Sequence, residues 1–438
     1  MIYKDAIQFL FNSLPMYQRQ GKAAYKENLD NTIRLDEYFR HPHHSFITIH
    51  VAGTNGKGSV SHMLASVLQQ SGKKTGLYTS PHLLDFRERI RIDGAPIPES
   101  EVSAFVSAHQ PIIQELEPSF FEMTVAMAFD HFKRHQVDVA VIETGMGGRL
   151  DSTNIICPVL TIITNISLDH TEFLGTEQAS IAREKGGIIK EGVPLIIGRA
   201  GSPAEGVLLT MAKSLNSRAI TAGRIYESLF HTLDREGSMH VRIRKTGQDV
   251  EEAHPTETFI CDLSGTYQLE NIITAITAIG ELRKLGWQIS KSHLSDGLAN
   301  VKKNTGILGR WQTIGSNPRS ICDTAHNSDG IIAVVRQIGQ VPRKRLHMVW
   351  GMVSDKDLDS ILPLLPGDAT YYFTPSSVPR SMDAEKLCQR AGDFGLKGSA
   401  WPGVREAYQA AQKAAGADDM IFTGGSTFVV ADLLKMKI

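Results

Sequence analysis

The sequence contains few cysteines and no long hydrophobic run. Four cysteines occur among 438 residues, far apart and without the close spacing of a metal site: Cys157, Cys261, Cys322 and Cys388. We expect reduced thiols, as in cytosolic proteins. No segment has the roughly 18 uninterrupted apolar residues of a membrane span. The first residues also lack the basic start and long apolar stretch of a signal peptide. The expected location is therefore the cytoplasm.

The chain also lacks a net charge of either sign. Its formal net charge is −1, so nothing predicts nucleic acid or an anionic membrane as a partner. Hydrophobic residues make up 42% and charged residues 21%, which is ordinary for a globular protein. At about 150 residues per domain, the length suggests two or three domains. No repeat or low-complexity tract is visible, and nothing requires an oligomer, so a monomer is expected.

The first part of the chain alternates between strand and helix patterns. Residues 46–52 are rich in β-branched side chains, and from Ser59 apolar residues recur at helical spacing. Residues 137–144, 158–167 and 193–198 are short, almost continuous apolar runs, which are typical of buried parallel strands. The pattern predicts an α/β domain with a parallel sheet and helices on both faces.

Residues 219–262 break this alternation. Within them, SMHVRIRKTG at 238–247 alternates polar and apolar side chains, with turn signals around Gly237 and Gly247, which predicts a small antiparallel patch. A helix is expected from about Leu269 to Leu285. The strand and helix alternation then resumes in a smaller, Rossmann-like α/β domain. The expected organisation is an ATPase-like domain at 1–300, a linker at 301–309 and the second domain at 310–438.

A glycine-rich turn separates the first predicted strand from its helix. Gly53, Gly56 and Gly58 allow backbone N–H groups to surround an anion, and the helix N-terminus favours negative charge. Lys57 would supply a point charge to outer phosphates, and Ser59 would lie near phosphates or a metal. The usual phosphate loop has serine or threonine directly after the lysine, so the pattern is not the common one. An ordinary glycine-rich turn is the alternative, but strand, lysine, serine and helix together favour a phosphate site.

Polar residues follow several other predicted strands. Glu143 ends the strand at 137–144, and a carboxylate at this edge of a parallel sheet suits Mg²⁺ bridging phosphates. His170 follows the next strand, where a structural histidine is the alternative. Asp323 ends a strand of the second domain and would bind a ribose or cap a helix. Arg310 is a lone cation beside the linker, and the alternative is a solvent-facing side chain.

Together these segments resemble the folylpolyglutamate synthase/dihydrofolate synthase family, which belongs to the Mur-ligase superfamily of ATP-dependent amide-forming ligases. The first domain carries VAGTNGKGS, YTSPHLLDFRERI, SFFEMTVAMAF, VIETGMGGRLDSTN, SLDHTEFLG and AREKGGIIK. YQLEN, DTAHN and WGMVSDKD follow, so the resemblance spans nearly the whole chain. TNGKG together with TSPHL is highly specific. Peptidoglycan ligases share the loop as GTNGKT and would lack TSPHL.

The resemblance implies roles for individual residues. ATP would be bound by Thr54, Asn55, Gly56, Lys57, Gly58, Ser59, Asn271, Arg310 and Asp323. Two Mg²⁺ ions would be held by Ser80, Glu143, His170 and a carbamylated Lys185, with a monovalent cation such as K⁺ as a further expectation. Lys57, His170 and Lys185 would be catalytic. A pterin substrate would contact Phe120, Phe121, Glu122, Leu150, Asp151 and Ser152, and less specifically the segment from Asn12 to Pro15.

The implied reaction transfers the γ-phosphoryl group of ATP to a carboxylate of dihydropteroate or a (tetrahydro)folyl-(poly)glutamate. The amine of L-glutamate then attacks the acyl phosphate. Because carboxylate and triphosphate repel each other, Mg²⁺ and Lys57 must offset their charge. Carbamylation would turn Lys185 from a cation into an additional anionic ligand. Arg310 would neutralise phosphate charge as the domains close, and closure would exclude water.

Two positions differ from the common family pattern, and other functions stay open. Ile307-Leu308 replaces Trp-Pro before Gly-Arg, and Thr324 replaces the glycine of Asp-Gly-Ala-His-Asn. One alternative is a Mur-type ligase with a non-folate acceptor. The other is a non-catalytic nucleotide-binding protein, for which Arg310 and Asp323 would be structural only. The sequence does not distinguish dihydrofolate synthesis from glutamate-tail extension.

Overall fold

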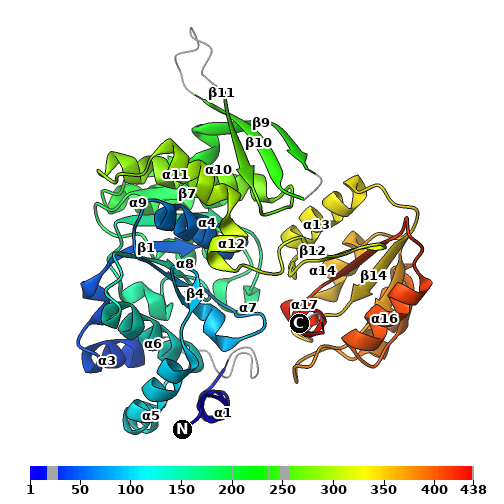
Figure 1. Cartoon of the computed structure of the whole chain (residues 1–438), viewed down its shortest axis with the longest axis horizontal. Coiled ribbons are helices and arrows are strands. Elements are labelled where there is room, and N and C mark those ends of the chain that lie inside the picture. Colours follow the sequence, from blue (N-terminus) through cyan, green and yellow to red (C-terminus); the bar gives the residue numbers. More distant parts are fainter. Residues whose placement is uncertain (17–27, 200, 235–236, 247–255, 437–438) are drawn as a thin grey trace. The chain divides into compact units, whose positions relative to one another are not determined.

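The computed structural model describes the chain except residues 17–27, 200, 235–236, 247–255 and 437–438. The chain forms two compact units (Figure 1). The first comprises Met1–Asp262 and Gln268–Ile307, and the second Leu263–Tyr267 and Leu308–Ile438. Among the described residues, no helix combines the length and apolar character needed to cross a membrane.

The first unit is built on an eight-stranded sheet with the order β4-β3-β2-β5-β1-β6-β7-β8. The strands from β2 to β8 pair in parallel, which confirms the predicted parallel sheet, while β3 and β4 add an antiparallel edge that was not foreseen. Bounds are β1 (Ile47–Ala52), β2 (Thr75–Tyr78), β3 (Ile90–Ile92), β4 (Ala95–Pro96), β5 (Val139–Glu143), β6 (Leu160–Asn165), β7 (Leu195–Arg199) and β8 (Ala219–Thr221).

Helices cover both faces of this sheet, as the apolar pattern predicts. Side chains of α1, α5 and α6 pack in one core with Tyr78 and Ile142, and those of α8 and α9 pack in another with Ile163 and Leu195. Helix α4 is buried from Ser59 to Leu68. Bounds are α1 (Tyr3–Ser13), α3 (Asp30–Tyr38), α4 (Lys57–Gln70), α5 (Glu99–Leu116), α6 (Phe120–Arg134), α7 (Thr171–Leu174), α8 (Gln178–Gly186), α9 (Ser202–Ser214), α10 (Gln268–Lys284), α11 (Lys291–Ala299) and α12 (Val301–Thr305).

Short 3₁₀ helices complete the connections: η2 (Pro42–Ser45), η3 (Phe86–Arg89), η4 (Ser152–Ile155), η5 (Ala222–Arg224) and, in the second unit, η6 (Leu362–Leu364).

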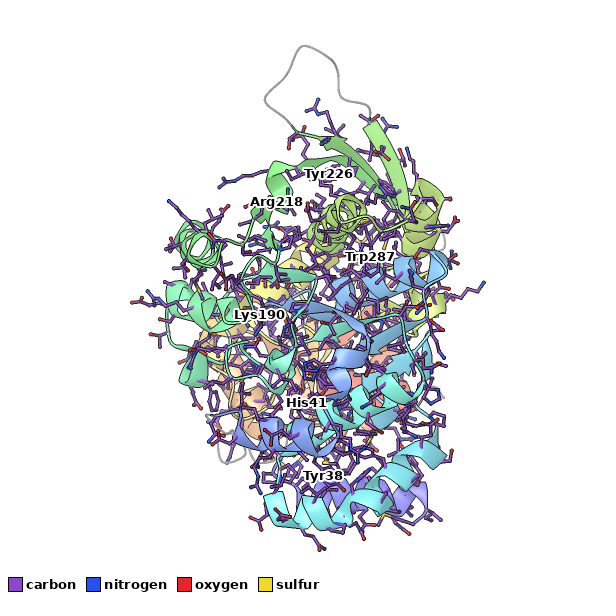
Figure 2. The ribbon with its side chains drawn as sticks, turned by 90° about the vertical axis from the view of Figure 1, so that its left-hand side faces the viewer. Tyr38, His41, Lys190, Arg218, Tyr226 and Trp287 are labelled. Atoms are coloured by element: carbon purple, nitrogen blue, oxygen red, sulfur yellow. The ribbon has the colours of Figure 1, made fainter. Side chains whose placement is uncertain are left out.

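Figure 2 shows side chains of the first unit, including Arg218, which forms an ion pair with the buried Glu281 of α10. This pair ties the segment that leads into β8 to α10.

The predicted antiparallel patch is a three-stranded sheet with the order β11-β10-β9. It comprises β9 (Tyr226–Leu233), β10 (Met239–Lys245) and β11 (Thr256–Cys261). It begins later than residue 219, because β8 pairs with the main sheet. Of the two predicted turns, Gly237 has a left-handed φ of +88°, and Gly247 lies outside the described residues. Alternate side chains of β10 are buried, as in a sheet with one covered face.

The second unit has a six-stranded sheet with the order β12-β13-β17-β14-β15-β16, parallel except for the β12–β13 pair. The predicted alternation of strands and helices in this domain is confirmed, although the segments of β12 and β16 carry no β-branched run that would mark them as strands. Bounds are β12 (Gln312–Ser316), β13 (Arg319–Cys322), β14 (Leu346–Trp350), β15 (Thr370–Phe373), β16 (Lys397–Ala400), β17 (Met420–Gly424), α13 (Ser328–Gln340), α14 (Leu358–Ile361), α15 (Ala384–Asp393), α16 (Val404–Ala414) and α17 (Thr427–Lys435).

The segment between the two units differs in detail from the expected linker. Residues 301–305 form the helix α12 and belong to the first unit, and the chain passes to the second unit after Ile307. The short segment Leu263–Tyr267 also belongs to the second unit. This assignment depends on which segments lie close together in space, so composition could not reveal it.

Candidate active site

Four adjacent strands of the first unit end beside one another. Parallel pairing joins β2 to β5, β5 to β1, and β1 to β6, so their carboxyl ends share one edge of the sheet. In the β1–β5 pair, Val51 lies opposite Glu143. The glycine loop, Ser80, Glu143 and the segment leading to His170 therefore start from the same edge, where α/β proteins bind ligands.

The glycine loop is tightly surrounded. Gly53 and Gly56 have φ values of +150° and +84°, and a Cβ on them would overlap Thr164 and Asn271 respectively. Glycine is therefore required at both positions for conformation and for space. Helix α4 begins at Lys57 and not at the predicted Ser59. The backbone N–H groups of its first turn are left without intrahelical acceptors, as an anion site requires.

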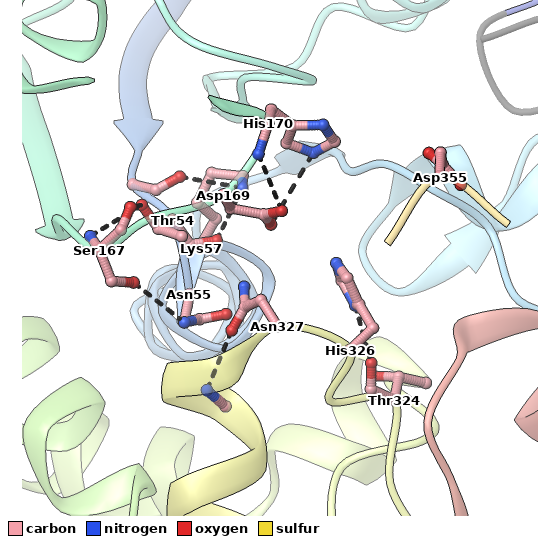
Figure 3. A network of polar contacts seen from close by, with 12 residues as sticks. Thr54, Asn55, Lys57, Ser167, Asp169, His170, Thr324, His326, Asn327 and Asp355 are labelled. Carbon is pink, nitrogen blue, oxygen red and sulfur yellow. Dashed lines mark hydrogen bonds and ion pairs between the residues drawn. The ribbon is translucent and has the colours of Figure 1, made fainter. Parts of the chain in front are cut away.

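The last residues of β6 and Ser167 just after it hold this loop in place, and Figure 3 shows Ser167 beside Thr54 and Asn55 of the loop. The Asn55 N–H donates to Asn165 Oδ1 at 2.7 Å, and the Thr164 hydroxyl donates to the Asn55 carbonyl at 2.6 Å. Thr54 Oγ1 donates to the Ser167 carbonyl at 3.0 Å and accepts from the Ser167 N–H at 3.1 Å. Sequence reasoning missed these three partners, although the polar run directly after an apolar strand marks them.

Two lysines converge on the carbonyl of Gly53. Lys57 Nζ lies 3.0 Å from this oxygen and Lys185 Nζ, which comes from α8, lies 2.9 Å from it. Lys185 is 4% exposed. Burial, reinforced by the positive charge of Lys57, lowers the pKa of Lys185 to about 7, although Asp169 and Asp151 act in the opposite direction. Near neutral pH a large fraction of Lys185 is therefore an uncharged amine.

The candidate metal ligands lie at the same edge. Glu143 is buried, and its Oε2 accepts the Ser80 N–H at 3.1 Å. His170 has a left-handed backbone with φ +50°, and its N–H donates to Asp169 Oδ1 at 2.9 Å. Its Nε2 is 3.9 Å from Asp169 Oδ2. Asp169 was missed, although it is the acidic residue between the strand end and His170. The Glu143 carboxylate and the Ser80 hydroxyl are oxygen donors of the kind that Mg²⁺ prefers and so fit this ion, while His170 would add one nitrogen donor.

Helix α10 closes one side of the loop. Gln268 Nε2 donates to Ser59 Oγ at 3.2 Å, and Asn271 Nδ2 donates to Gln268 Oε1 at 2.8 Å. Ser59 is 2% exposed, and this hydrogen bond joins α4 to α10; its placement near phosphates or a metal stays a prediction. Asn271 lies against Gly56, and its role in ATP binding also stays a prediction.

The predicted pterin segment starts α6. Ser119 caps this helix, and its N–H donates to Glu122 Oε2 at 2.5 Å, which completes a capping box. The Phe120 N–H donates to the Pro15 carbonyl at 2.9 Å. The segment from Asn12 to Pro15 thus meets the start of α6, and the Glu122 carboxylate serves helix capping.

Aromatic rings gather around Phe120. Its ring centroid is 5.3 Å from that of Phe11 and 5.8 Å from that of Phe86. The Arg89 guanidinium lies 5.2 Å from the Phe120 centroid, and its Nε donates to His82 Nδ1 at 2.7 Å. Phe11, Phe86, Arg89 and His82 were not singled out from the sequence, although three of them lie in the TSPHLLDFRER segment. Phe86 and Phe120 belong to the buried core, and Phe11 is partly buried against it.

The Leu150, Asp151 and Ser152 segment organises the turn after β5. The Asp151 carboxylate accepts the N–H groups of Gly145 at 2.8 Å and Met146 at 3.0 Å, and the Thr153 hydroxyl at 2.6 Å. Burial raises the pKa of Asp151, while these hydrogen bonds act in the opposite direction. Asp151 therefore holds the backbone that follows Glu143. A Cβ on Gly145 would lie 2.6 Å from the Phe121 ring, so Phe121 packs on this turn.

The remaining predicted residues belong to the second unit. Asp323 is 3% exposed, and its Oδ2 accepts the Tyr267 hydroxyl at 2.5 Å and the Trp311 N–H at 2.7 Å. Burial raises the pKa of Asp323. Arg310 donates to the Thr324 hydroxyl, and its guanidinium is therefore not a lone solvent-facing group. The residue that caps α13 is Asn327, whose Oδ1 accepts the Gly330 N–H at 2.9 Å.

Comparison with known proteins supports the resemblance. The model of the Mur ligase middle domain matches residues 51–279, and that of the Mur ligase glutamate ligase domain matches residues 309–427. A dihydrofolate synthase/folylpolyglutamate synthase of Escherichia coli K12 is 32% identical over 88% of this chain and 85% of its own. The chain belongs to the folylpolyglutamate synthase/dihydrofolate synthase family. Another relative, the probable bifunctional folylpolyglutamate synthase/dihydropteroate synthase of Haloferax volcanii, is 33% identical over 99% of this chain. This chain spans 50% of the length of that relative.

Solved structures of the family have the same fold. The E. coli FolC complex with DHPP and ADP gives a TM-score of 0.84 at 29% identity, covering 100% of this chain and 97% of that one. A Yersinia pestis bifunctional folylpolyglutamate synthase/dihydrofolate synthase complexed with AMPPNP and a manganese ion gives 0.82 at 26% identity, covering 100% and 98%. The predicted two-domain α/β fold is thereby confirmed.

Proposed function

We propose that this chain is an ATP-dependent ligase that joins L-glutamate to the carboxylate of dihydropteroate or a folyl-(poly)glutamate and releases ADP and phosphate. The observation that carries the proposal is the glycine loop with Lys57 and Lys185 at the carboxyl ends of β1, β5 and β6, in a chain that belongs to this ligase family. The match of residues 309–427 to a glutamate ligase domain supports glutamate as the amine substrate.

The loop would bind the triphosphate through its backbone and Lys57. Gly53 and Gly56 let the chain turn without side chains, so the N–H groups of the first turn of α4 can approach phosphate oxygens. The bonds from Asn55 to the last residue of β6 and from Thr54 to Ser167 fix the loop before ATP binds. Because the loop is already in its binding conformation, ordering it adds no free-energy cost during the reaction, and this favours phosphoryl transfer.

The divalent metal would be held by Ser80, Glu143 and His170, with the carbamate of Lys185 as a further anionic ligand. When bound, it would offset the negative charge of the triphosphate and of the attacking carboxylate. The manganese ion in the Y. pestis relative supports a divalent cation. Two magnesium positions and a monovalent cation such as K⁺ stay predictions from the resemblance, as do the roles of Arg310 and Asp323 in ATP binding.

The surroundings of Lys185 support its carbamylation. An uncharged amine attacks CO₂, forms an N–C bond and loses one proton, which gives an anionic carbamate. An ordinary lysine with a pKa of about 10.4 is uncharged in roughly one molecule in a few thousand at pH 7. Burial brings the pKa of Lys185 to about 7, so this form is abundant. The carbamate keeps one N–H for the Gly53 carbonyl, and the neighbouring Lys57 would attract its charge.

The aromatic cluster at the start of α6 suits a flat heteroaromatic substrate. Phe86 and Phe120 are buried and pack edge-on, and the partly buried Phe11 packs tilted against Phe120; aromatic rings favour such packing with one another and with a flat ligand. Phe121 and the turn held by Asp151 link this cluster to Glu143. A pterin bound here would direct its carboxylate-bearing tail along the strand ends.

Product analysis tests the proposal. The protein is incubated with ATP, Mg²⁺, L-glutamate and either dihydropteroate or tetrahydrofolate, and products are identified by mass spectrometry. We expect ADP release that requires both glutamate and a pterin acceptor, with a product one glutamate heavier. ADP release without an acceptor, or ligation only to a non-pterin acid, would contradict it. Monomeric state and cytoplasmic location stay predictions from the sequence, and sedimentation analysis tests the former.

A further inference from the structure

We propose that Glu101, His131 and His135 form a second metal site, one that binds a zinc-like transition-metal ion. One ligand atom from each residue can be chosen so that all lie within 4.8 Å of one another. Glu101 comes from the first turn of α5, His131 from the last turn of α6, and His135 directly follows α6. His131 lies eleven residues beyond Phe120, or roughly 16 Å along the helix, so this cluster is separate from the proposed substrate end of α6.

The distances are already close to those of a coordinated ion. Glu101 Oε2 is 3.0 Å from His131 Nδ1, and Glu101 Oε1 is 3.0 Å from His135 Nε2. Two ligands at about 2.0–2.1 Å from zinc in tetrahedral geometry are about 3.3 Å apart. The two carboxylate–imidazole distances are therefore within a few tenths of an ångström of those in a zinc site, and the two imidazole nitrogens lie within 4.8 Å of each other. The two imidazoles are four residues apart, which places them on one helix face, with ring centroids 4.4 Å apart.

The donor set selects the type of ion. Two imidazoles and one carboxylate match the ligands of many open zinc sites, in which the fourth position is taken by water. Nitrogen donors favour Zn²⁺, Ni²⁺ or Cu²⁺ over Mg²⁺, which prefers oxygen. His131 is buried, whereas the side chains of Glu101 and His135 are 23% and 38% exposed, so solvent reaches the carboxylate and one imidazole. The buried ligand is thus fixed while an entry path exists.

A purely structural ion-pair cluster is the alternative. Arg134 NH2 lies 3.2 Å from Glu101 Oε2, and its Nε donates to Asp130 at 2.9 Å. Arg134 can therefore keep Asp130 while it releases Glu101 to a metal. Its positive charge opposes cation binding. The two interpretations therefore predict opposite effects of Arg134→Gln. The substitution would weaken the contacts of a structural cluster, but it would raise the affinity of a metal site for its cation.

Metal titration of the full chain distinguishes them. Zn²⁺ binding is measured by calorimetry, and Co²⁺ binding by visible absorption, with excess Mg²⁺ and ADP present to occupy oxygen-rich sites. We expect one tight Zn²⁺ per chain, weakened more than about tenfold in His135→Ala and strengthened in Arg134→Gln. The matched control is His240→Ala, since His240 is similarly exposed at 40% and pairs with a single carboxylate, Asp234, at 3.2 Å. Its Zn²⁺ affinity should not change.

Two further measurements distinguish the loss of the metal site from misfolding of a variant. Glu101→Gln keeps the side-chain shape and a hydrogen-bonding oxygen but loses the charge, and it should also weaken Zn²⁺ binding. Zn²⁺ should raise the Tm of the wild type and not that of His135→Ala, because an ion that binds only the folded state stabilises it. Equal Zn²⁺ affinity in wild type and His135→Ala, or an anomalous zinc peak away from these three residues in a crystal, would overturn the proposal.

Discussion

Glu143 and Asp323 are both acidic residues at the end of a buried parallel strand, but the fold treats them differently. Asp323 accepts hydrogen bonds from Tyr267, from Trp311 and from the Ala325 N–H at 2.8 Å. These contacts fix the start of the second unit. Glu143 meets the backbone of Ser80 at the edge where the glycine loop and Lys185 converge. A strand-end acid therefore indicates a ligand site only when the surrounding chain brings other ligand-binding groups to it.

The largest expected effect is at the glycine loop. Lys57→Ala should lower ATP-dependent ligation by at least about a hundredfold, because a positive charge at the transferring phosphate is lost in a site built for it. A coupled assay of ADP release measures it, with circular dichroism to check the fold. Lys213→Ala, on the exposed side of α9, is the control. Undiminished turnover in Lys57→Ala would remove the loop from the mechanism.

The second-largest effect on activity is expected at Lys185. Lys185→Ala should reduce activity by about a hundredfold, because a ligand carboxylate is missing, and added acetate should restore part of it. Steady-state rates with and without acetate check this. The acetate effect should be absent in the wild type. Wild-type activity of Lys185→Ala without any additive is incompatible with the carbamate.

A substitution at Tyr267 tests the hydrogen bond that this residue donates to Asp323, the acidic residue at the end of β13. Tyr267→Phe removes the hydroxyl that donates to buried Asp323, so the free energy of unfolding should fall by about 1–3 kcal/mol. Urea unfolding followed by fluorescence measures the change. Tyr38→Phe is the control, since its hydroxyl contacts His109 at an exposed site and the expected change is within about 0.5 kcal/mol. Equal effects of the two substitutions would show that Asp323 does not depend on Tyr267.

The smallest effect should occur at Thr324. Thr324→Gly introduces the residue common in the family and removes the hydroxyl that accepts from Arg310. The expected loss of stability is about 0.5–1.5 kcal/mol, measured by the same urea unfolding. Thr324→Ser keeps the hydroxyl and should behave like the wild type. If serine and glycine are equally destabilising, the hydroxyl is not the relevant group.

Much of the fold could be predicted from local patterns. The apolar runs at 137–144 and 158–167 correspond to β5 and β6, and Gly286 follows α10 with a left-handed φ of +92°. Edge strands such as β16 were missed, because KGSA has neither alternation nor β-branched side chains. At the candidate site, the loop and Glu143 could be found because each follows a recognisable strand.

The sequence by itself determined which segments are strands, where the glycine loop lies and which family the motifs resemble, because each of these is a local pattern. Only the tertiary structure decided the partners. Asn55 and Asn165 are 110 residues apart, Ser59 and Gln268 are 209 apart, and Tyr267 and Asp323 are 56 apart. The buried state of Lys185, and hence its lowered pKa, also arises from packing. Such contacts depend on how elements pair in space, and no local pattern encodes that pairing.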